Sequence, residues 1–500
     1  MLGKKKYEPK FLYNISLEQL VPEENYYRIL DKVLDLNFIY KKCEPLYGTT
    51  GNKSIDPVVF FKLNLYGYFE NIISDRELIR RVSDSLAARL YLGYDIDEEL
   101  PWHSTISRTR ALMPEGLFEE IFNKVLSMCS EAGLLEGTHQ SIDSTLVKAN
   151  ASLEKVERIT PKLTLEKYIE KVRKENTIEE KDSSEEEQNK SGEKKQQGAN
   201  EQLNVIKNSK GIKRTKLSNK NYKSKTDSDS RIAKKPGKPV SLYYTVHYAV
   251  DSQARIITEV LSTHSDISDY DSLITVVDRA KRRINQLDKQ IESIGADKGY
   301  CSGENLEQLE SRNIKPYMPT QKHINTTGGL DKKEFIYDQH RDIYLCPDNR
   351  ELTYKYTSRK NARVYSAGKK GCENCPIKQR CTQGKQQRKI QHSIYRKEYE
   401  GLFQRMNSSE GRKMMKIRKS HSEALFAEAK MNHGLSKFLT IGISKSQKKA
   451  YIIATVQNLK RLIRYLRTNT RKSFSQLLKD CSHFKEIYCE IKFKLVIQCP

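Results

Sequence analysis

The stretch SLYYTVHYAVD (241–251) places every second residue on one apolar face. A period of two is typical of a β-strand, and ARIITEVLST (254–263) predicts the strand that lies beside it. A helical pattern follows in SDYDSLITVVDRAKRRINQL (268–287), and IESIGADKGYC (291–301) then predicts a short buried strand. Strands and helices in this order predict a mixed α/β core.

The charge of the chain indicates a polyanionic partner. Lys and Arg total 89 against 64 Asp and Glu, which leaves a net charge of +25. Double-stranded DNA is the partner we expect, because each phosphate that a cation neutralises releases a counterion. A solvated basic surface without a specific partner would also account for this charge.

The length of 500 residues allows several domains, and a hydrophobic content of 37% suffices for a buried core. No apolar run approaches the roughly 18 residues that cross a bilayer, and the N-terminal residues lack the apolar segment of a secretory signal. We therefore expect a cytoplasmic, nucleoid-associated protein without a membrane partner.

Helical patterns fill the first 135 residues. IDPVVFFKLNLYGYFENI (55–72) has apolar residues at helical spacing, and SDRELIRRVSDSLAARLYLG (74–93) predicts one helix that Ser74 and Glu77 open as a capping box. HSTISRTRALM (103–113) predicts another helix with a Ser/Thr cap. A solvated helix face is the simpler interpretation for any one arginine here. Together, five arginines are candidate DNA contacts: Arg76, Arg80, Arg81, Arg108 and Arg110.

Four of the ten cysteines cluster late in the chain: Cys346, Cys372, Cys375 and Cys381. Four thiolates predict a closed tetrahedral site for structural Zn²⁺, with an iron–sulfur centre or four unligated thiols as the alternatives. Metal binding could organise this basic, turn-rich segment, which we expect to hold too few apolar residues to fold alone. The other cysteines are expected to be isolated, buried side chains rather than disulfide partners.

Two aspartates occupy comparable places in predicted strands. Asp143 lies in SIDST, and Asp297 ends the strand in IGADKGYCS. Carboxylates at strand ends converge at one edge of a sheet, where two Mg²⁺ (or Mn²⁺) ions about 4 Å apart can activate an attacking oxygen and stabilise a leaving one. Taken alone, either aspartate is more often a turn or cap residue.

A third carboxylate is expected on the helix RKSHSEALFAEAKMNHGL (418–435), where Glu423 and Glu428 are both candidates. Lys430 lies seven residues after Glu423 and shares its face, from which it could bind a DNA phosphate beside the metal ions. Arg418 of the same helix is a further candidate DNA contact. A solvated helix with scattered charge is the alternative.

Taken together, these segments resemble those of bacterial insertion-sequence transposases of the DDE class. SIDST with KANAS resembles that family's first-Asp motif, ADKGYCSGENLEQL the second, and SEALFAEAK the Glu motif, in which Phe and Lys follow the Glu at +3 and +7. Phe426 and Lys430 meet this register, which favours Glu423 over Glu428. SIDPVVFFKL, SDRELIRRV, HSTISRTR and QNLKRLIRYL also resemble parts of the family, which carries a cysteine cluster as well.

The resemblance implies a ribonuclease H-like α/β core in which Asp143, Asp297 and Glu423 hold two Mg²⁺ ions. It further implies an enzyme that binds the ends of a mobile element, cleaves DNA and joins the 3′-hydroxyl ends to target DNA, as a homodimer in a synaptic complex. A degenerate relative that binds DNA without cutting it, and a metal-dependent nuclease of the same fold, are the other interpretations.

The sequence departs from the family pattern in two places. Ala427 stands where the family has Gly, and Ile441 stands where it has Arg before Gly442. Neither change removes a metal ligand, but both put local helix packing or a DNA contact in doubt.

Composition and resemblance together divide the chain. EEKDSSEEEQNKSGEKKQQGANEQ (179–202) has almost no apolar residues and cannot repay the entropy of folding. The expected parts are a helical DNA-binding domain at 1–135, the core in three pieces at 136–160, 239–335 and 396–470, a charged and largely disordered insertion at 161–238, a Cys-rich insertion at 336–395, and a tail of unknown role at 471–500.

Overall fold

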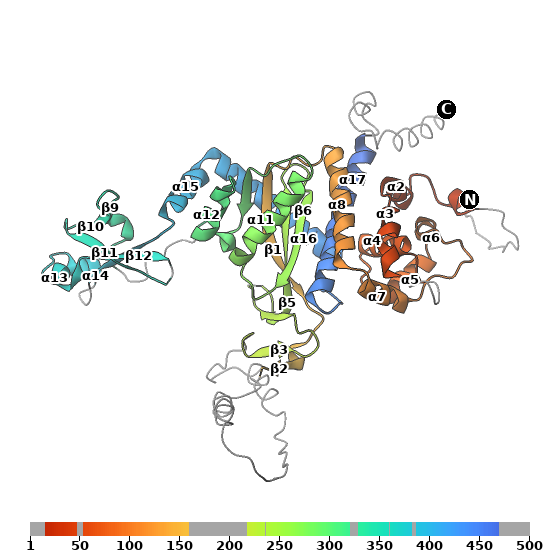
Figure 1. Cartoon of the computed structure of the whole chain (residues 1–500), viewed down its shortest axis with the longest axis horizontal. Helices are drawn as coiled ribbons and strands as arrows, with labels where there is room; N and C mark the ends of the chain where they lie inside the picture. Colours follow the sequence, from red (N-terminus) through yellow and green to blue (C-terminus); the bar gives the residue numbers. More distant parts are fainter. Residues whose placement is uncertain are drawn as a thin grey trace, which may run out of the picture.

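The computed structural model describes residues 16–47, 54–159, 218–235, 237–320, 329–359, 361–382 and 387–469. Figure 1 shows a helical region, a central sheet with helices packed against it, and a small separate sheet at the opposite end. A ribbon of β2 (Val156–Arg158) and β3 (Tyr222–Ser224) projects from the central part (Figure 1). Within these ranges, no helix is both long and apolar enough to cross a bilayer.

Short helices that bury apolar faces against one another build the helical region. They are α1 (Leu17–Leu20), α2 (Tyr26–Val33), α3 (Phe38–Cys43), η1 (Glu44–Leu46), α4 (Pro57–Phe69), α5 (Asp75–Ser83), α6 (Leu86–Leu92), α7 (His103–Leu112) and α8 (Glu115–Glu131). The start of α4 follows from its sequence: Asp56 accepts hydrogen bonds from two first-turn amides, and Pro57 has no amide hydrogen to satisfy.

A helix begins directly after Ser74 as predicted, but the caps and the number of helices predicted after α4 need correction. The segment 74–93 forms two helices, α5 and α6, and Ser85 caps the second by accepting a hydrogen bond from a main-chain amide. The predicted capping box is wrong, because Ser74 accepts no cap hydrogen bond and Glu77 pairs instead with two arginines of its own helix. The Ser/Thr cap predicted for α7 is also wrong, since α7 begins after Trp102 without a side-chain cap.

The central sheet has the order β6-β5-β1-β7-β8, and β4 pairs with the start of β5. Its strands are β1 (His139–Lys148), β4 (Arg231–Ala233), β5 (Ser241–Asp251), β6 (Ile257–His264), β7 (Ser293–Ala296) and β8 (Lys315–Tyr317). β5 runs antiparallel to β1 and β6, whereas β7 and β8 run parallel to β1. This is the ribonuclease H-like arrangement, so the predicted fold class is confirmed.

Helices cover both faces of the sheet. α11 (Asp269–Asn285) and α12 (Gly303–Ser311) lie on the side of Ser144, and α16 (Ser409–Asn432) lies on the side of Asp143. α15 (Arg396–Asn407) precedes α16, and α17 (Ile443–Asn469) runs between β6 and α8. Because of this cover, all 11 residues of β5 are buried, including the polar positions of its alternating pattern.

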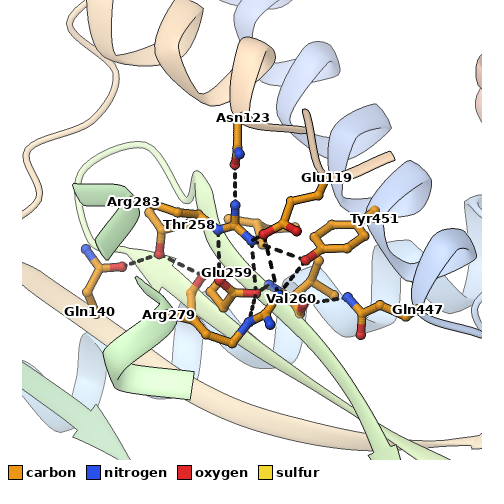
Figure 2. Close-up of polar contacts among 12 residues, drawn as sticks. Glu119, Asn123, Gln140, Thr258, Glu259, Val260, Arg279, Arg283, Gln447 and Tyr451 are labelled. Carbon is orange, nitrogen blue, oxygen red and sulfur yellow. Dashed lines mark hydrogen bonds and ion pairs between the residues drawn. The ribbon is translucent and has the colours of Figure 1, made fainter. Parts of the chain in front are cut away.

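A buried charge network joins the helical region to the sheet. Figure 2 shows Glu259 of β6 between Arg279 and Arg283 of α11, with Tyr451 of α17 beside them. Glu259 accepts hydrogen bonds from Arg283 Nε at 2.8 Å and Arg279 Nε at 3.1 Å, and its side chain is fully buried. Arg283 also donates to Glu119 of α8 at 2.6 Å. Arg283 of α11 therefore links β6, α8 and α17, because it bonds Glu259, Glu119 and Tyr451.

The cysteine-bearing segment forms a five-stranded antiparallel sheet of its own. It contains η4 (Lys332–Glu334), β9 (Ile336–Asp338), β10 (Ile343–Leu345), β11 (Glu351–Thr357), β12 (Ala362–Ser366), α13 (Gly368–Glu373), α14 (Lys378–Thr382) and β13 (Lys389–Ser393). Its core includes Tyr344 and Tyr365, and Asp342 accepts a hydrogen bond from the Tyr365 hydroxyl at 2.6 Å. The segment therefore has a small core of its own, to which two tyrosines contribute, and the expectation that it needs metal to fold stays a prediction.

Two predicted segments lie mainly outside the residues that the structure describes. The charged insertion predicted at 161–238 lies outside the described residues up to 217, and its last part carries β3 and β4. The tail at 471–500 lies wholly outside them. The predicted domain boundaries therefore stay predictions.

Candidate active site

Asp143 and Asp297 lie side by side where the parallel pairing of β1 with β7 ends, Asp143 within β1 and Asp297 just after β7. The register of β1 and β7 pairs Ile142 with Ala296, so the next residue on each strand is an aspartate. The side chain of Asp143 is 20% exposed, so it stays accessible although β1 lies between β5 and β7. Asp297 follows β7 directly and accepts a hydrogen bond from the Lys298 amide at 2.7 Å. The structure thus brings together two of the three predicted carboxylates.

The electrostatic environment of Asp143 and Asp297 favours a bound cation between the two carboxylates. Burial raises the pKa of Asp143, and the nearby carboxylates of Asp297 and Asp269 raise it further. The amide of Ser144 and the guanidinium of Arg418 act in the opposite direction. Arg418 Nη1 lies 3.5 Å from Asp143 Oδ2 and is the cation that the structure places on this carboxylate.

Asp269 is a fourth carboxylate that the sequence reasoning missed. It begins α11, where Ser268 caps the helix, and its Oδ1 accepts a hydrogen bond from Ser144 Oγ at 2.8 Å. The chain after Asp297 passes close by, because a Cβ atom on Gly299 would lie 3.3 Å from Asp269 Oδ2. The run of acids in SDISDYDS (265–272) was the available signal.

Glu423 and Glu428 take different sides of α16. Burial would raise the pKa of Glu428, but hydrogen bonds from His433, Arg461 and Gln457 outweigh it and lower the pKa to about 2. Glu428 is therefore a structural acid that ties α16 to α17, with Arg461 Nη2 at 2.7 Å. Glu423 is exposed and forms no ion pair within the described part of the chain.

The spacing of the Glu motif has a packing explanation. Phe426 stacks on Tyr248 at a centroid distance of 4.5 Å, and Tyr248 is the β5 neighbour of Asp143. Lys430 Nζ donates to Thr145 Oγ1, on the same face of β1 as Asp143. α16 therefore packs over the part of β1 that carries Asp143. Glu423 lies on this helix less than one turn before Phe426.

The donors present fit a divalent cation in chemistry but do not form a closed ligand set. Asp143 and Asp297 supply the hard oxygen atoms that Mg²⁺ prefers, and their mutual repulsion would be relieved by a cation. Among the described residues, no three His, Cys, Asp or Glu side chains are arranged to hold a metal ion. Glu423 is the carboxylate that stands apart.

The four clustered cysteines lie near one another beside the small sheet, two of them in α13 and α14 and two in loops. Burial raises the pKa of Cys381, and the thiols of Cys372, Cys375 and Cys346 raise it further. Cys346 Sγ accepts a hydrogen bond from a main-chain amide at 3.3 Å. All four are free thiols, and the soft donors fit Zn²⁺ in chemistry, although the arrangement is not that of a ligand set.

The predicted arginines of the helical region divide into two groups. Arg76 and Arg108 are exposed on α5 and α7, and Arg80 and Arg81 are exposed but share Glu77 as partner. Arg110 is only 12% exposed, and both of its terminal nitrogens donate to Asp75. The prediction of a DNA contact at Arg110 therefore gives way to a packing role, because its guanidinium joins α7 to α5.

The two departures from the family pattern have little effect on packing. Ala427 is exposed on α16, where an extra methyl group meets no core residue. Gly442 has a φ of +95°, a conformation that favours glycine, and Ile441 before it is 42% exposed.

Comparisons with known families agree with this geometry. Residues 15–112 match a family described as Transposase domain (DUF772), and residues 345–463 match one described as Transposase DDE domain. The second match includes the part of α16 that carries Glu423 and Lys430. Both matches are to transposase families, and together they support an insertion-sequence transposase of the DDE class. No curated protein matches this chain.

Proposed function

We propose that this chain binds the ends of a mobile DNA element, cleaves the DNA there and joins the 3′-hydroxyl ends to target DNA. The adjacency of Asp143 and Asp297, just beyond the last paired residues of the parallel strands β1 and β7, carries the proposal. Phosphoryl transfer without a covalent enzyme intermediate depends mainly on groups positioned in this way.

Each predicted residue has a place in the proposal. Asp143, Asp297 and Glu423 would hold two Mg²⁺ or Mn²⁺ ions, which when bound activate the attacking oxygen and stabilise the leaving one. Arg418 and Lys430 would contact the DNA backbone near the cut. Exposed arginines of α5 and α7 would bind the element ends: Arg76, Arg80, Arg81 and Arg108.

The remaining parts of the proposal concern assembly. The cluster of Cys346, Cys372, Cys375 and Cys381 would hold a structural Zn²⁺. Two copies of the chain would pair two element ends in one synaptic complex, and action on chromosomal DNA would place the protein at the nucleoid.

The central test uses full-length protein, Mg²⁺ and labelled duplexes that contain the DNA flanking the coding sequence. We expect the wild type to cut them and to form strand-transfer products. Asp297→Asn should lose about 1000-fold in both, because a lost metal ligand removes several kcal/mol of transition-state stabilisation. Asp278→Asn is the matched control, since Asp278 of α11 pairs with Arg312 away from the site.

A second pair of variants decides which glutamate acts. Glu423→Gln should lose cleavage while keeping its stability, because Glu423 is exposed and unpaired in the described structure. Glu428→Gln should keep cleavage and lose stability, because it breaks the pair with Arg461. The opposite outcome would assign the third carboxylate to Glu428.

End binding can be measured apart from cleavage. Trp102 is the chain's single tryptophan and is 75% exposed in the helical region, so its fluorescence should respond to bound DNA. Wild-type protein that binds ends without cutting them would be the non-catalytic relative. Cleavage without joined products would identify a nuclease of the same fold.

A further inference from the structure

Three lysines from two distant segments gather beside the aspartate pair. Lys430 of α16 donates to Thr145 Oγ1, and Lys238, which follows β4, donates to the main-chain oxygen of Leu146 at 2.6 Å. Lys235 Nζ lies 3.8 Å from Asp269. Sequence reasoning named only Lys430 among them, because 92 residues separate Lys238 from Leu146.

In the part of the chain that the structure describes, two of these ammonium groups form no ion pair, although the Asp143 carboxylate lies near enough to Lys430 to raise its pKa. Lys235 faces a carboxylate, but Lys238 and Lys430 form no ion pair within the described ranges. Burial, together with the neighbouring ammonium groups of Lys430 and Lys235, lowers the pKa of Lys238 to about 8. Burial likewise lowers the pKa of Lys430. Partly buried cations that repel one another are stabilised by an anion bound between them.

The position of the lysines selects the anion. Thr145 lies two residues beyond Asp143 on β1, which corresponds to about 7 Å along a strand. This distance is similar to the spacing between neighbouring phosphates of one DNA strand. A phosphate bound at the lysines would therefore be the neighbour of the phosphate at the aspartates. Lysine binds phosphate as a point charge without a demanding geometry, so two ammonium groups can share one phosphate.

We propose that Lys238 and Lys430, with Lys235 at the rim, bind the DNA phosphate next to the one that is cleaved. This assignment rests on the proposed function and deepens it. The lysines position the strand, whereas the carboxylates act at the reacting phosphate.

The test measures binding of full-length protein to duplexes in which one phosphate at a time is replaced by an uncharged methylphosphonate. Ca²⁺ replaces Mg²⁺ so that the DNA stays intact. For the wild type, one replacement beside the cut should weaken binding about tenfold, the effect of one charged hydrogen bond. Lys238→Ala should bind unmodified DNA about tenfold more weakly and be insensitive to that replacement. Its affinity should also depend less on salt, by about one unit of log–log slope.

Lys281→Ala is the matched control, because Lys281 is also half-buried and donates to a main-chain oxygen, that of Arg312, at 3.3 Å. It should behave like the wild type. Lys430→Gln is the second variant, and it should lose sensitivity at the same phosphate as Lys238→Ala. Circular dichroism confirms that each variant is folded.

The assignment is overturned if Lys238→Ala and Lys430→Gln keep the full wild-type response to every methylphosphonate. That result, with cleavage by the wild type intact, removes the lysine site and leaves the proposed function standing. Loss of sensitivity at one phosphate in a protein that never cuts DNA would keep the lysine site and remove the catalytic function.

Discussion

Replacing Glu259 with Gln should weaken the junction between the helical region and the sheet. The side chain of Glu259 is fully buried, and it neutralises both Arg279 and Arg283. Glutamine retains one oxygen acceptor but no charge, so Arg283, which is 6% exposed, would keep only Glu119 as an ionic partner. Removing one partner of a buried ion pair costs about 3–5 kcal/mol. We expect about 3 kcal/mol here, because Glu119 compensates in part.

Urea unfolding followed by far-ultraviolet circular dichroism measures this loss. With a denaturant slope of about 1–3 kcal/mol per molar, the first transition should move to lower urea by about 1 M or more. Glu119→Gln is the matched control: Glu119 binds the same arginine but is 35% exposed, so about 1 kcal/mol is expected. A Glu259→Gln midpoint equal to or above that of Glu119→Gln would refute the view that the buried charge stabilises this junction.

Three further predictions concern other parts of the molecule. The pKa of Glu428 is lowered to about 2 in the folded protein, so its ionised form contributes about 2–3 kcal/mol to the free energy of unfolding above pH 4.5. This contribution is lost as the pH falls toward 2, so the stability of Glu428→Gln should change less with pH over that range. Purified protein should contain about one zinc per chain, and Cys375→Ser should lower this content when metal is measured by atomic emission. Arg108→Ala should weaken end binding and reduce its salt dependence by about one unit of slope, whereas Arg110→Ala should lower the melting temperature with the salt dependence unchanged.

The sequence predicted those parts of the fold that depend on local pattern. The sequence placed both aspartates on or directly after short apolar strands, and these strands pair in parallel, which brings Asp143 and Asp297 together. The expectation that both lie at strand ends holds for Asp297 only, because β1 continues to Lys148. The register of the Glu motif also pointed to Glu423, and the stacking of Phe426 on Tyr248 gives the physical basis of that register.

Other parts depend on contacts that no local pattern contains. Lys238 meets β1 only after the chain has passed through the charged insertion, and its own segment has the composition of a loop. The small sheet was missed because its strands are short and its core is built from residues such as Tyr344 and Tyr365, whose hydroxyls find partners inside the core.

Arg418 connects the predicted DNA contact with the observed ion pair. Its guanidinium supplies the positive charge on Asp143, yet its Nε atom is buried and has no hydrogen-bond partner within the described chain. The hydroxyls of Ser141 on β1 and Ser422 on α16 are in the same condition. Each buried polar group without a partner costs about 1–3 kcal/mol of stability, so the contact between α16 and β1 is less stable than the surrounding core. Arg418 contacts Asp143 through Nη1, and a guanidinium has five N–H donors, so the same side chain can hold Asp143 and donate to a DNA phosphate. The observed ion pair and the predicted DNA contact are therefore compatible, and the exposed Glu423 lies on the same helix.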